Sequence, residues 1–485
     1  MTSRHSGASH AAWIDGAVVT DSAAERFEVH DPSTGEALVT MEAAGPAIVD
    51  RAAQSAREAF AGAWGAVQPT ERSRLLLRIA DAIRSQADEL ALLEATDAGV
   101  PLYLARSDAQ VAARYFEFYA GMADKFGGET IPLEGPYLDY TLRQPWGVCA
   151  VVVPFNFPLQ QVARSVSAAL ATGNSVVVKA SERSPLIAVE LARICGEAGL
   201  PAGAFNVVQG LAATGEALLL HEDVDHATFT GSRVAGSAVM AVCARRVIPV
   251  TLELGGKSAQ IVLHESRLEE AAQAIAGVMF RTAGQACSAG SRVLVREDLR
   301  ERLSELLVEQ TRALRVGSAV EAGVDVGPLI SPEQRDRVLG RIEEATDAGA
   351  RLRVGGAPAP GSVPERGNFV LPTILEDVDP DAWISRHEVF GPVLGLTPVT
   401  DAKHALELAN DSDFGLVAGV WTSDVGEALA LARDLDVGQV FVNNYGAGGG
   451  VELPFGGRKG SGFGREKGLE ALAAYTQLKN VCVKL

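Results

Sequence analysis

From residue 148 onward, the chain alternates short apolar runs with segments of helical periodicity. The apolar runs span 148–153, 175–179, 205–208, 228–230 and 247–254, and the helical patterns between them span 159–172, 185–196 and 234–243. This alternation predicts βαβ units that build a parallel sheet. The strands lack polar alternation, so helices should cover both faces of the sheet. We therefore expect a doubly wound, Rossmann-type α/β domain with a ligand site at the carboxyl ends of its strands.

A second α/β domain should follow the first. The chain has 485 residues, which is more than the roughly 250–300 at which one hydrophobic core stops growing. Beyond about residue 258 the pattern predicts a helix over 268–282, a strand over 291–295 and a helix over 300–315. Ahead of the first apolar run, helices are predicted over 47–60, 69–95 and 112–122, and residues 1–20 are expected to be frayed.

Composition disfavours several classes of function. The formal net charge of −18 disfavours nucleic acid and anionic membranes as partners, because both require clustered Lys and Arg. No apolar run approaches the ~18 residues of a membrane span, and the N-terminus shows no secretory signal. The five cysteines are scattered without CxxC spacing. That pattern predicts no disulfide framework and no metal site, and it favours a reducing cytoplasm.

Cys287 and Glu253 form the candidate chemical pair. A thiol supplies a soft nucleophile, and a carboxylate supplies a base that can activate water. Together they suit covalent carbonyl chemistry in which an acyl-enzyme forms and is then hydrolysed. Each residue has an ordinary alternative, since a lone Cys is more often a packing residue and a Glu before Gly-Gly more often flanks a turn.

Three segments after predicted strands could hold ligand groups. Gly231 and Ser232 join a strand to a helix, where backbone N–H groups can approach a pyrophosphate, although the spacing is not GxGxxG and a plain turn would look alike. Lys179 and Glu182 could bind a ribose diol or form a solvated ion pair. Asn156, held between two prolines, could donate to a developing oxyanion or simply satisfy turn carbonyls.

The complete set of segments resembles the aldehyde dehydrogenase superfamily over essentially the whole chain. The similar segments, in the family's order, are PFNFP (154–158), KASE (179–182), FTGS (229–232) with Gly236, ELGGK (253–257), GQAC (284–287), EVFGP (388–392) and PFGG to SGFGRE (454–466). Seven motifs in order are highly specific. The resemblance implies oxidation of an aldehyde to a carboxylate with NAD(P)⁺, through a thioester on the cysteine.

The resemblance also assigns roles to residues. It implies Cys287 as the nucleophile, Glu253 as the general base and Asn156 as the oxyanion-hole amide. The implied cofactor-binding residues are Phe155, Lys179, Ser181, Glu182, Gly231, Ser232, Gly236, Leu254, Gly255, Glu388 and Phe390. The implied substrate-binding residues are Phe157, Gln161, Arg164, Ser288 and Phe455. No metal is implied. Some relatives carry a proton-relaying Lys where this chain has Ser165, so the resemblance does not extend to that relay.

The sequence constrains the choice of cofactor and substrate less than it constrains the type of reaction. Glu182 favours NAD over NADP, because a carboxylate accepts from the ribose 2′-OH and repels a 2′-phosphate, although NADP use stays possible in the family. Some semialdehyde dehydrogenases use an Arg at the position matching Arg164 to bind a distal carboxylate. The alternative is that Arg164 forms an interdomain or surface ion pair and that the substrate is an aryl aldehyde. A CoA-acylating relative and a non-catalytic nucleotide-binding protein are the other functional alternatives.

The resemblance divides the chain into three units. It implies an NAD-binding domain formed by residues 1–122 and 146–255, and a catalytic domain formed by 256–445, with 446–470 returning along the active site. Residues 123–145 and 471–485 should form a small β element for oligomerisation. The apolar tail around Val481 and Val483 predicts an edge strand that needs a partner. We therefore expect a homodimer or homotetramer.

Overall fold

An eight-stranded sheet forms one half of the molecule. The computed structural model describes residues 11–446 and 450–485. The strands of this sheet, in spatial order, are β2 (Ala17–Val19), β1 (Ala12–Ile14), β9 (Phe205–Val208), β8 (Ser175–Lys179), β7 (Val148–Val152), β10 (His226–Thr230), β11 (Val250–Glu253) and β21 (Gly462–Phe463). The five strands from β9 to β11 are parallel, as the apolar runs predict.

Helices cover both faces of this sheet. One face carries α1 (Pro46–Ala61), α7 (Ala212–Leu220) and α8 (Arg233–Arg246), and the other carries α2 (Pro69–Ser85), α3 (Ala87–Ala98), α4 (Leu102–Ala120), α5 (Pro158–Ala171) and α6 (Leu186–Glu197). Successive side chains of a strand point to opposite faces. Val148 and Ala150 accordingly pack in the core beneath α1 and α7, whereas Cys149 and Val151 pack in the core beneath α5.

A seven-stranded sheet forms the other half. Its strands, in spatial order, are β14 (Arg351–Gly356), β15 (Leu371–Glu376), β16 (Val393–Val399), β13 (Arg292–Arg296), β12 (Ala259–Val262), β18 (Val417–Trp421) and β19 (Gln439–Val442). All neighbours are parallel except β14 and β15. The flanking helices are α9 (Leu268–Phe280), α10 (Arg300–Ala313), α11 (Pro332–Asp347), α12 (Trp383–Arg386), α13 (Ala402–Asn410) and α14 (Val425–Asp434), with 3-10 turns at Glu265–Arg267 and Glu297–Leu299.

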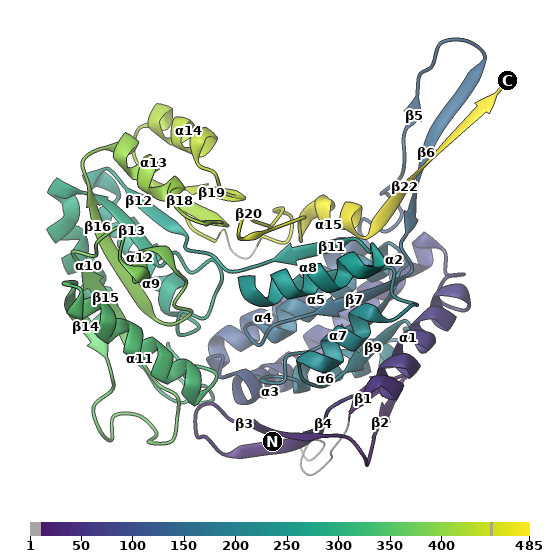
Figure 1. Ribbon diagram of the computed structural model, residues 1–485, viewed down its shortest axis with the longest axis horizontal. Coiled ribbons are helices and arrows are strands. Elements are labelled where there is room, and N and C mark those ends of the chain that lie inside the picture. The colour runs from purple at the N-terminus through teal and green to yellow at the C-terminus, as the bar shows by residue number, and fades with distance from the viewer. Residues whose placement is uncertain (1–10, 447–449) are drawn as a thin grey trace.

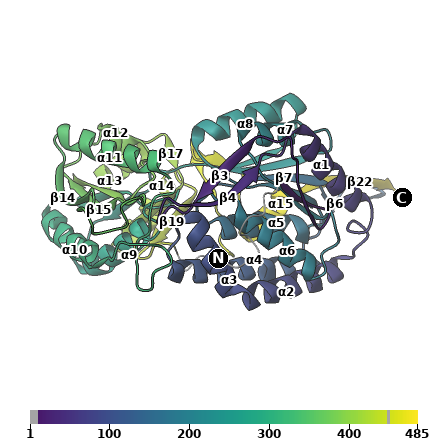
Figure 2. The same ribbon diagram turned by 90° about the horizontal axis from the view of Figure 1, so that it is seen from below.

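Two segments join the halves. The hairpin of β3 (Arg26–His30) and β4 (Ala37–Glu42) lies at the boundary between them (Figure 2), and its turn bonds to the second half through Asn368 N–H to the Pro32 carbonyl. The C-terminal segment returns through β17 (Phe414–Gly415) paired with β20 (Arg458–Lys459), and β21 then pairs antiparallel with β11. The return places this segment against Glu253, the last residue of β11.

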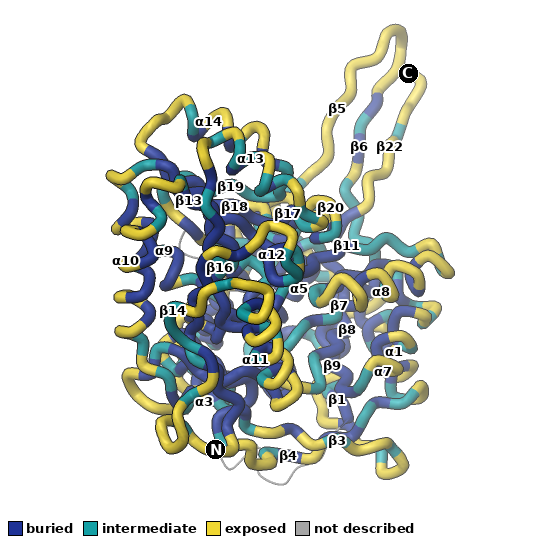
Figure 3. Tube along the Cα trace, turned by 60° about the vertical axis from the view of Figure 1, so that its left-hand side comes forward, coloured by how far each residue is buried: buried dark blue, intermediate teal, exposed yellow. Residues whose placement is uncertain are grey.

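A three-stranded arm projects from the first half. It consists of β5 (Thr130–Ile131), β6 (Tyr137–Pro145) and β22 (Thr476–Lys484), and α15 (Gly468–Ala474) leads into it. Figure 3 shows that most of the arm is exposed. No helix within residues 11–446 and 450–485 is both long and apolar enough to cross a membrane.

Two local predictions are wrong. Residues 11–20 are not frayed, because Ala12 and Ile14 are fully buried and β1 pairs with β9. The helix expected over 69–95 is two helices that break at Gln86. The segment 446–470, which is predicted to return along the active site, includes 447–449, and these three residues lie outside the described residues.

Candidate active site

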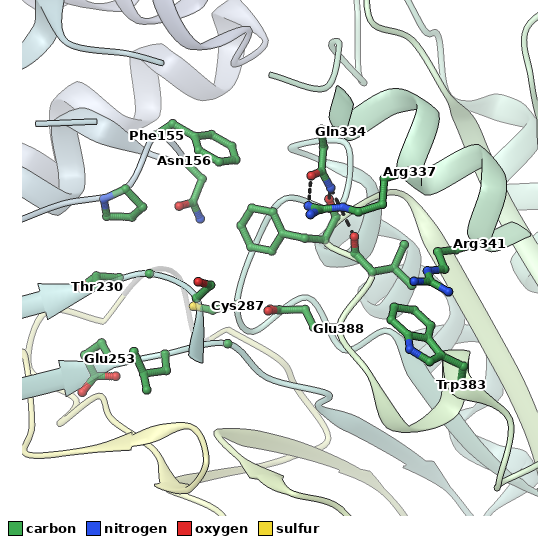
Figure 4. A pocket seen from close by; sticks show the side chains of 17 residues that line it. Phe155, Asn156, Thr230, Glu253, Cys287, Gln334, Arg337, Arg341, Trp383 and Glu388 are labelled. Atoms are coloured by element: carbon green, nitrogen blue, oxygen red, sulfur yellow. Dashed lines mark hydrogen bonds between the residues drawn. The ribbon is translucent and has the colours of Figure 1, made fainter. Parts of the chain in front are cut away.

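The carboxyl ends of β7, β10 and β11 line one edge of a cavity of about 420 Å³. Asn156 follows β7, Thr230 ends β10, and Glu253 ends β11. Figure 4 shows these residues with Cys287 on one side of the cavity and Arg337, Arg341 and Trp383 toward the other. Ligands bind at such strand ends in open α/β sheets. The edge predicted from the sequence is therefore the edge that the cavity occupies.

The loop after α9 presents Cys287 to this cavity. Ala283 and Gly284 both adopt positive φ values, 51° and 69°, so the chain turns sharply before the cysteine. A Cβ atom at Gly284 would lie 2.1 Å from the Gly391 carbonyl oxygen, which explains why this position carries glycine. The Asn156 amide donates a hydrogen bond to the Gln285 carbonyl at 3.0 Å. That bond ties the predicted oxyanion donor to the loop of the predicted nucleophile.

Cys287 lies where two cavities meet. It lines the 420 Å³ cavity and also a chamber of about 110 Å³ on the other side, together with Asn156. Burial, with Glu388 nearby, raises the pKa of the Cys287 thiol to about 12. The cysteine is thus a protonated thiol in this state, and attack requires that its proton be removed.

Glu253 is a buried carboxylate with the properties of a base. Its residue is 2% exposed, and neither carboxylate oxygen has a hydrogen-bond partner among the described residues. Burial raises its pKa well above the usual range, against the lowering effect of Arg164. A carboxylate desolvated in this way binds a proton more readily than an exposed one, as a general base requires. A Cβ at Gly456 would lie 2.7 Å from Glu253 Oε1, so the returning segment leaves room for the carboxylate.

A buried ion pair supports the floor of the chamber. Arg164 Nε lies 3.2 Å from Glu466 Oε2, and Arg164 also donates to the Thr230 hydroxyl at 2.9 Å. Glu466 accepts from the Ser165 and Thr228 hydroxyls at 3.3 and 2.7 Å. Ser165 thus contacts Glu466 as a hydroxyl, and the positive charge beside Glu466 comes from Arg164.

Seven of the predicted cofactor residues line the larger cavity. They are Phe155, Gly231, Ser232, Leu254, Gly255, Glu388 and Phe390. Gly255 lacks the Cβ that would lie 2.1 Å from Glu388 Oε2, and Glu388 accepts from the Gly256 N–H at 3.2 Å. Burial raises the pKa of Glu388 to about 7. These groups fit a ligand that presents ribose hydroxyls and a planar ring.

The other four predicted cofactor residues do not line this cavity. Lys179 and Glu182 form an ion pair at 3.2 Å at the end of β8, next to β7 in the sheet. Ser181 accepts from the Arg183 N–H. Gly236 lies in the first turn of α8, where a Cβ would meet the Leu254 side chain at 2.4 Å. They remain predicted contacts.

All five predicted substrate residues line the 110 Å³ chamber. These are Phe157, Gln161, Arg164, Ser288 and Phe455. The chamber also contains Tyr115, Arg281 and Lys467, which the sequence did not suggest. On the cofactor side, the unpredicted lining residues are Gln334, Arg337, Arg341 and Trp383 of α11 and α12. In the sequence, these residues could have been found only from the spacing of Gln334, Arg337 and Arg341. This spacing of three and four residues places them on one face of a helix.

Comparison with known proteins agrees with this geometry. The sequence profile of the Aldehyde dehydrogenase family matches residues 19–481. The chain belongs to the aldehyde dehydrogenase family. It is therefore an oxidoreductase acting on aldehydes. The betaine aldehyde dehydrogenase of Brucella anthropi is 40% identical to this aldehyde dehydrogenase over 482 residues, covering 99% of this chain and 97% of that protein.

Solved structures of the family share the whole fold. The gamma-glutamyl-gamma-aminobutyraldehyde dehydrogenase from Burkholderia cenocepacia J2315 superimposes with a TM-score of 0.95 at 43% identity, covering 98% of this chain and 97% of that one. The NAD⁺ complex of an aldehyde dehydrogenase from Bacillus cereus gives a TM-score of 0.95 at 38% identity, covering 99% and 97%. The expected α/β fold with parallel sheets is confirmed.

Proposed function

We propose that this enzyme oxidises an aldehyde to the carboxylic acid with NAD⁺ through a covalent intermediate on Cys287. The position of Cys287 carries the proposal, because this thiol lines both the larger cavity and the chamber beside it. An aldehyde in the chamber and a cofactor in the larger cavity would meet at its sulfur. Asn156 and Glu253 both line the larger cavity with it.

Three residues, Cys287, Asn156 and Glu253, carry the steps of the proposed mechanism. The deprotonated Cys287 sulfur attacks the aldehyde carbon, and the Asn156 amide and the Cys287 N–H hold the resulting oxyanion. When bound, NAD⁺ supplies the hydride acceptor. Glu253 then deprotonates the water that hydrolyses the thioester on Cys287, which releases the acid and frees the Cys287 sulfur as the thiolate. The unpartnered oxygens of Glu253 leave it able to accept that proton.

NAD⁺ is the preferred cofactor in this proposal. Phe155, Glu388 and Phe390 would hold the nicotinamide end, and Glu182 would accept from the adenosine ribose. A 2′-phosphate would meet the Glu182 carboxylate, which disfavours NADP⁺. Glu182→Ser should accordingly narrow the difference in kcat/KM between the two cofactors, and a higher wild-type kcat/KM with NADP⁺ would contradict this preference.

The substrate class is narrower than aldehydes in general. The relatives named above are named for different aldehydes, so their names do not select one. A semialdehyde or an aryl aldehyde fits best with the chamber, which combines the rings of Phe157 and Phe455 with cationic side chains.

The decisive experiment compares wild type with Cys287→Ala on a panel of aliphatic, aryl, amino and carboxylated aldehydes. NADH formation with NAD⁺ should fall at least about a hundredfold in the variant, because an essential group is removed. Cys482→Ala, at an exposed cysteine of β22, is the matched control and should behave as wild type. Full activity of Cys287→Ala would remove the nucleophile from its role, and NADH formation only with added CoA would favour the acylating alternative.

A further inference from the structure

We propose that Lys467 is the substrate-facing cation of this enzyme and that it selects aldehydes bearing an acid group. This inference rests on the proposed function, because it assumes that the aldehyde carbon sits at Cys287. Lys467 lies one residue after the family segment ending at Glu466, and its position in the chamber is what assigns the role.

Position along the substrate path is the first observation. The 110 Å³ chamber that contains Cys287 adjoins an outer cavity of about 300 Å³ that does not contain it. Residues that line both cavities mark their junction: Gln160, Val278, Arg281, Ser288, Phe455 and Lys467. A group held by Lys467 is therefore at the outer end of the chamber, while the reacting carbon is at the inner end.

The conformation of Lys467 is the second observation. Its φ and ψ are 64° and 172°, a region that is almost confined to glycine. The neighbouring Gly468 continues the same turn with a φ of 57°. Phe455 N–H and Glu466 N–H exchange backbone bonds at 2.6 and 2.7 Å, which fixes the segment just before Lys467. Strained residues of this kind cluster at ligand clamps because the surrounding structure holds them in place.

Arg164 is less suited to the same task. Its guanidinium is already held by Glu466 at 3.2 Å and by Thr230 at 2.9 Å. Arg164 and Lys467 lie near one aromatic ring, since their cationic groups are 5.9 and 5.2 Å from the centroid of Phe455. The Arg164 charge is thus compensated by Glu466, and Arg164 lines the chamber without lining the outer cavity, whereas Lys467 lines both.

The electrostatic surroundings favour an anion. Burial, with Arg164 nearby, lowers the pKa of Lys467 to about 8, and an anionic partner would reverse that shift. Arg281 adds a further cation at the junction, with its guanidinium 5.6 Å from the ring centroid of Phe157. The titratable acids facing this region are Glu253, Cys287 and, across the outer cavity, Asp108. Burial raises the pKa of each of these three groups. A carboxylate on the substrate would therefore meet a chamber of positive charge.

Matched pairs of substrates test the proposal in the wild-type enzyme. The probes are 4-oxobutanoate against butanal, and 4-carboxybenzaldehyde against benzaldehyde, each with NAD⁺. We expect kcat/KM to favour the acid-bearing member by at least about tenfold in one pair or both. A preference for the neutral member in both pairs would overturn the inference and leave the proposed function standing. Absence of turnover with every aldehyde would overturn the proposed function and this inference together.

Substitution of Lys467 then tests whether this residue is the source of the preference for acid-bearing aldehydes. Lys467→Gln should lower the acid-to-neutral ratio of kcat/KM by about tenfold, ~1.4 kcal/mol, whatever it does to turnover as such. Lys467→Arg should restore most of the ratio, and Lys403→Gln, at an exposed lysine on α13, is the control. An unchanged ratio in Lys467→Gln would overturn the assignment.

A pH profile of the wild-type enzyme tests the role of Lys467 without any substitution. The acid-to-neutral ratio should fall above about pH 8, where Lys467 loses its charge. Effects of Cys287 and Glu253 on the chemical steps act on both substrates and cancel in the ratio, whereas repulsion of the acid by their charges would persist in Lys467→Arg. Lys467→Arg should remove this fall. A fall that persists unchanged in Lys467→Arg would come from the other titratable groups of the region, Glu253, Cys287 and Asp108, and would contradict the role of Lys467.

Discussion

At the residue scale, the proposed mechanism gives Cys287 and Glu253 two successive steps of one reaction, acylation and hydrolysis, which experiments can separate. Both groups are buried, and burial raises the pKa of each. A buried carboxyl without hydrogen-bond partners is a poor structural element, since desolvating a charge is unfavourable unless it is paired. It is a good base for the same reason, because protonation relieves that penalty.

Glu253→Gln should therefore separate acylation from hydrolysis. We expect a burst of NADH of about one equivalent per active site, followed by a steady rate at least about a hundredfold below wild type. Stopped-flow absorbance measures both phases. Neither burst nor turnover would place Glu253 before hydride transfer, and a normal steady rate would show that another base activates the water.

Gly456 offers a second test of the same carboxylate. A Cβ there would lie 2.7 Å from Glu253 Oε1 and also 2.7 Å from the Gly464 carbonyl, so Gly456→Ala must displace the base or its support. We expect slower thioester hydrolysis, by about tenfold or more, with the burst retained. Gly196→Ala in α6, where a Cβ meets nothing within 4 Å, is the control. Equal steady rates in the two variants would show that the site tolerates the added methyl group.

Sequence patterns predicted some residues of the candidate site and missed others. Cys287, Glu253 and Asn156 were predicted because they fall in motifs with recognisable spacing, and the structure brings them to one cavity. Arg281 and Lys467 were missed, because a lone cation in a sequence looks the same whether it faces solvent or a chamber. The return of the chain across β11 at Gly462–Phe463 brings Lys467 into the chamber that also contains the nucleophile.

At the element scale, α3 ties together the two loops that bear site residues. Glu94 Oε1 accepts from the Leu159 N–H at the start of α5, and Asp97 Oδ2 accepts from the Leu186 N–H at the start of α6. Neither α5 nor α6 has a side-chain cap of its own. The two fully buried acids therefore act as caps supplied by a third helix.

The two caps supplied by α3 also account for the break between α2 and α3 at Gln86, which the sequence did not predict. The apolar spacing of α2 continues without interruption into α3, so periodicity gives no sign of a boundary at Gln86. The strands were predicted well because continuous apolar runs are specific for buried parallel strands. The helix boundary depends instead on where Glu94 and Asp97 must point, which is a tertiary requirement.

The buried acid Asp97 makes stability depend on pH. Burial raises its pKa from 3.8 to about 8, so between these values the folded state holds a proton that the unfolded state releases. Stability from this group therefore falls as pH rises through that window. The melting temperature should drop between about pH 4 and about pH 8 and should drop less in Asp97→Asn, by a few degrees, since ~1 kcal/mol moves Tm by ~2–4 °C in a domain of this size.

Asp88→Asn provides the matched control on the same helix, because the Asp88 side chain is 83% exposed. Differential scanning fluorimetry across the pH range measures all three proteins. Parallel pH dependences in wild type and Asp97→Asn would show that the pH sensitivity comes from other groups, such as the neighbouring Glu94 and Asp108 pair.

At the scale of the whole molecule, both halves line the larger cavity, the first with residues at the ends of β7, β10 and β11 and the second with residues of α11 and α12. The arm projects away from both halves (Figure 1). The domain division follows from the alternation of strands and helices, since each sheet is built from its own stretch of chain. The exceptions are β1, β2 and β21, which join the first sheet from distant segments. Short strands of two or three residues carry too little pattern to be predicted.

The three-stranded arm is the part of the molecule through which we expect copies of this chain to associate. Within the described chain, β22 pairs with β6 on one side only, which leaves the backbone groups of its other edge open. Large apolar side chains are exposed on the same strands, including Leu138, Leu142, Leu478 and Val483. An exposed apolar edge strand is a site for pairing with another chain. We therefore expect a dimer or tetramer in which a second copy covers the arm.

Leu478→Asp tests this expectation, because it places a charge on the edge strand where the side chain is 58% exposed. In the folded monomer the change should be nearly neutral, since surface substitutions typically alter stability by less than ~0.5 kcal/mol. In an assembly it would bury an unpaired carboxylate, so sedimentation velocity at micromolar concentration should show a shift toward the monomer. Leu429→Asp on α14, at a side chain 65% exposed, introduces the same charge away from the arm and should sediment as wild type. A monomeric wild type, or equal dissociation of both variants, would show that the arm is not the interface.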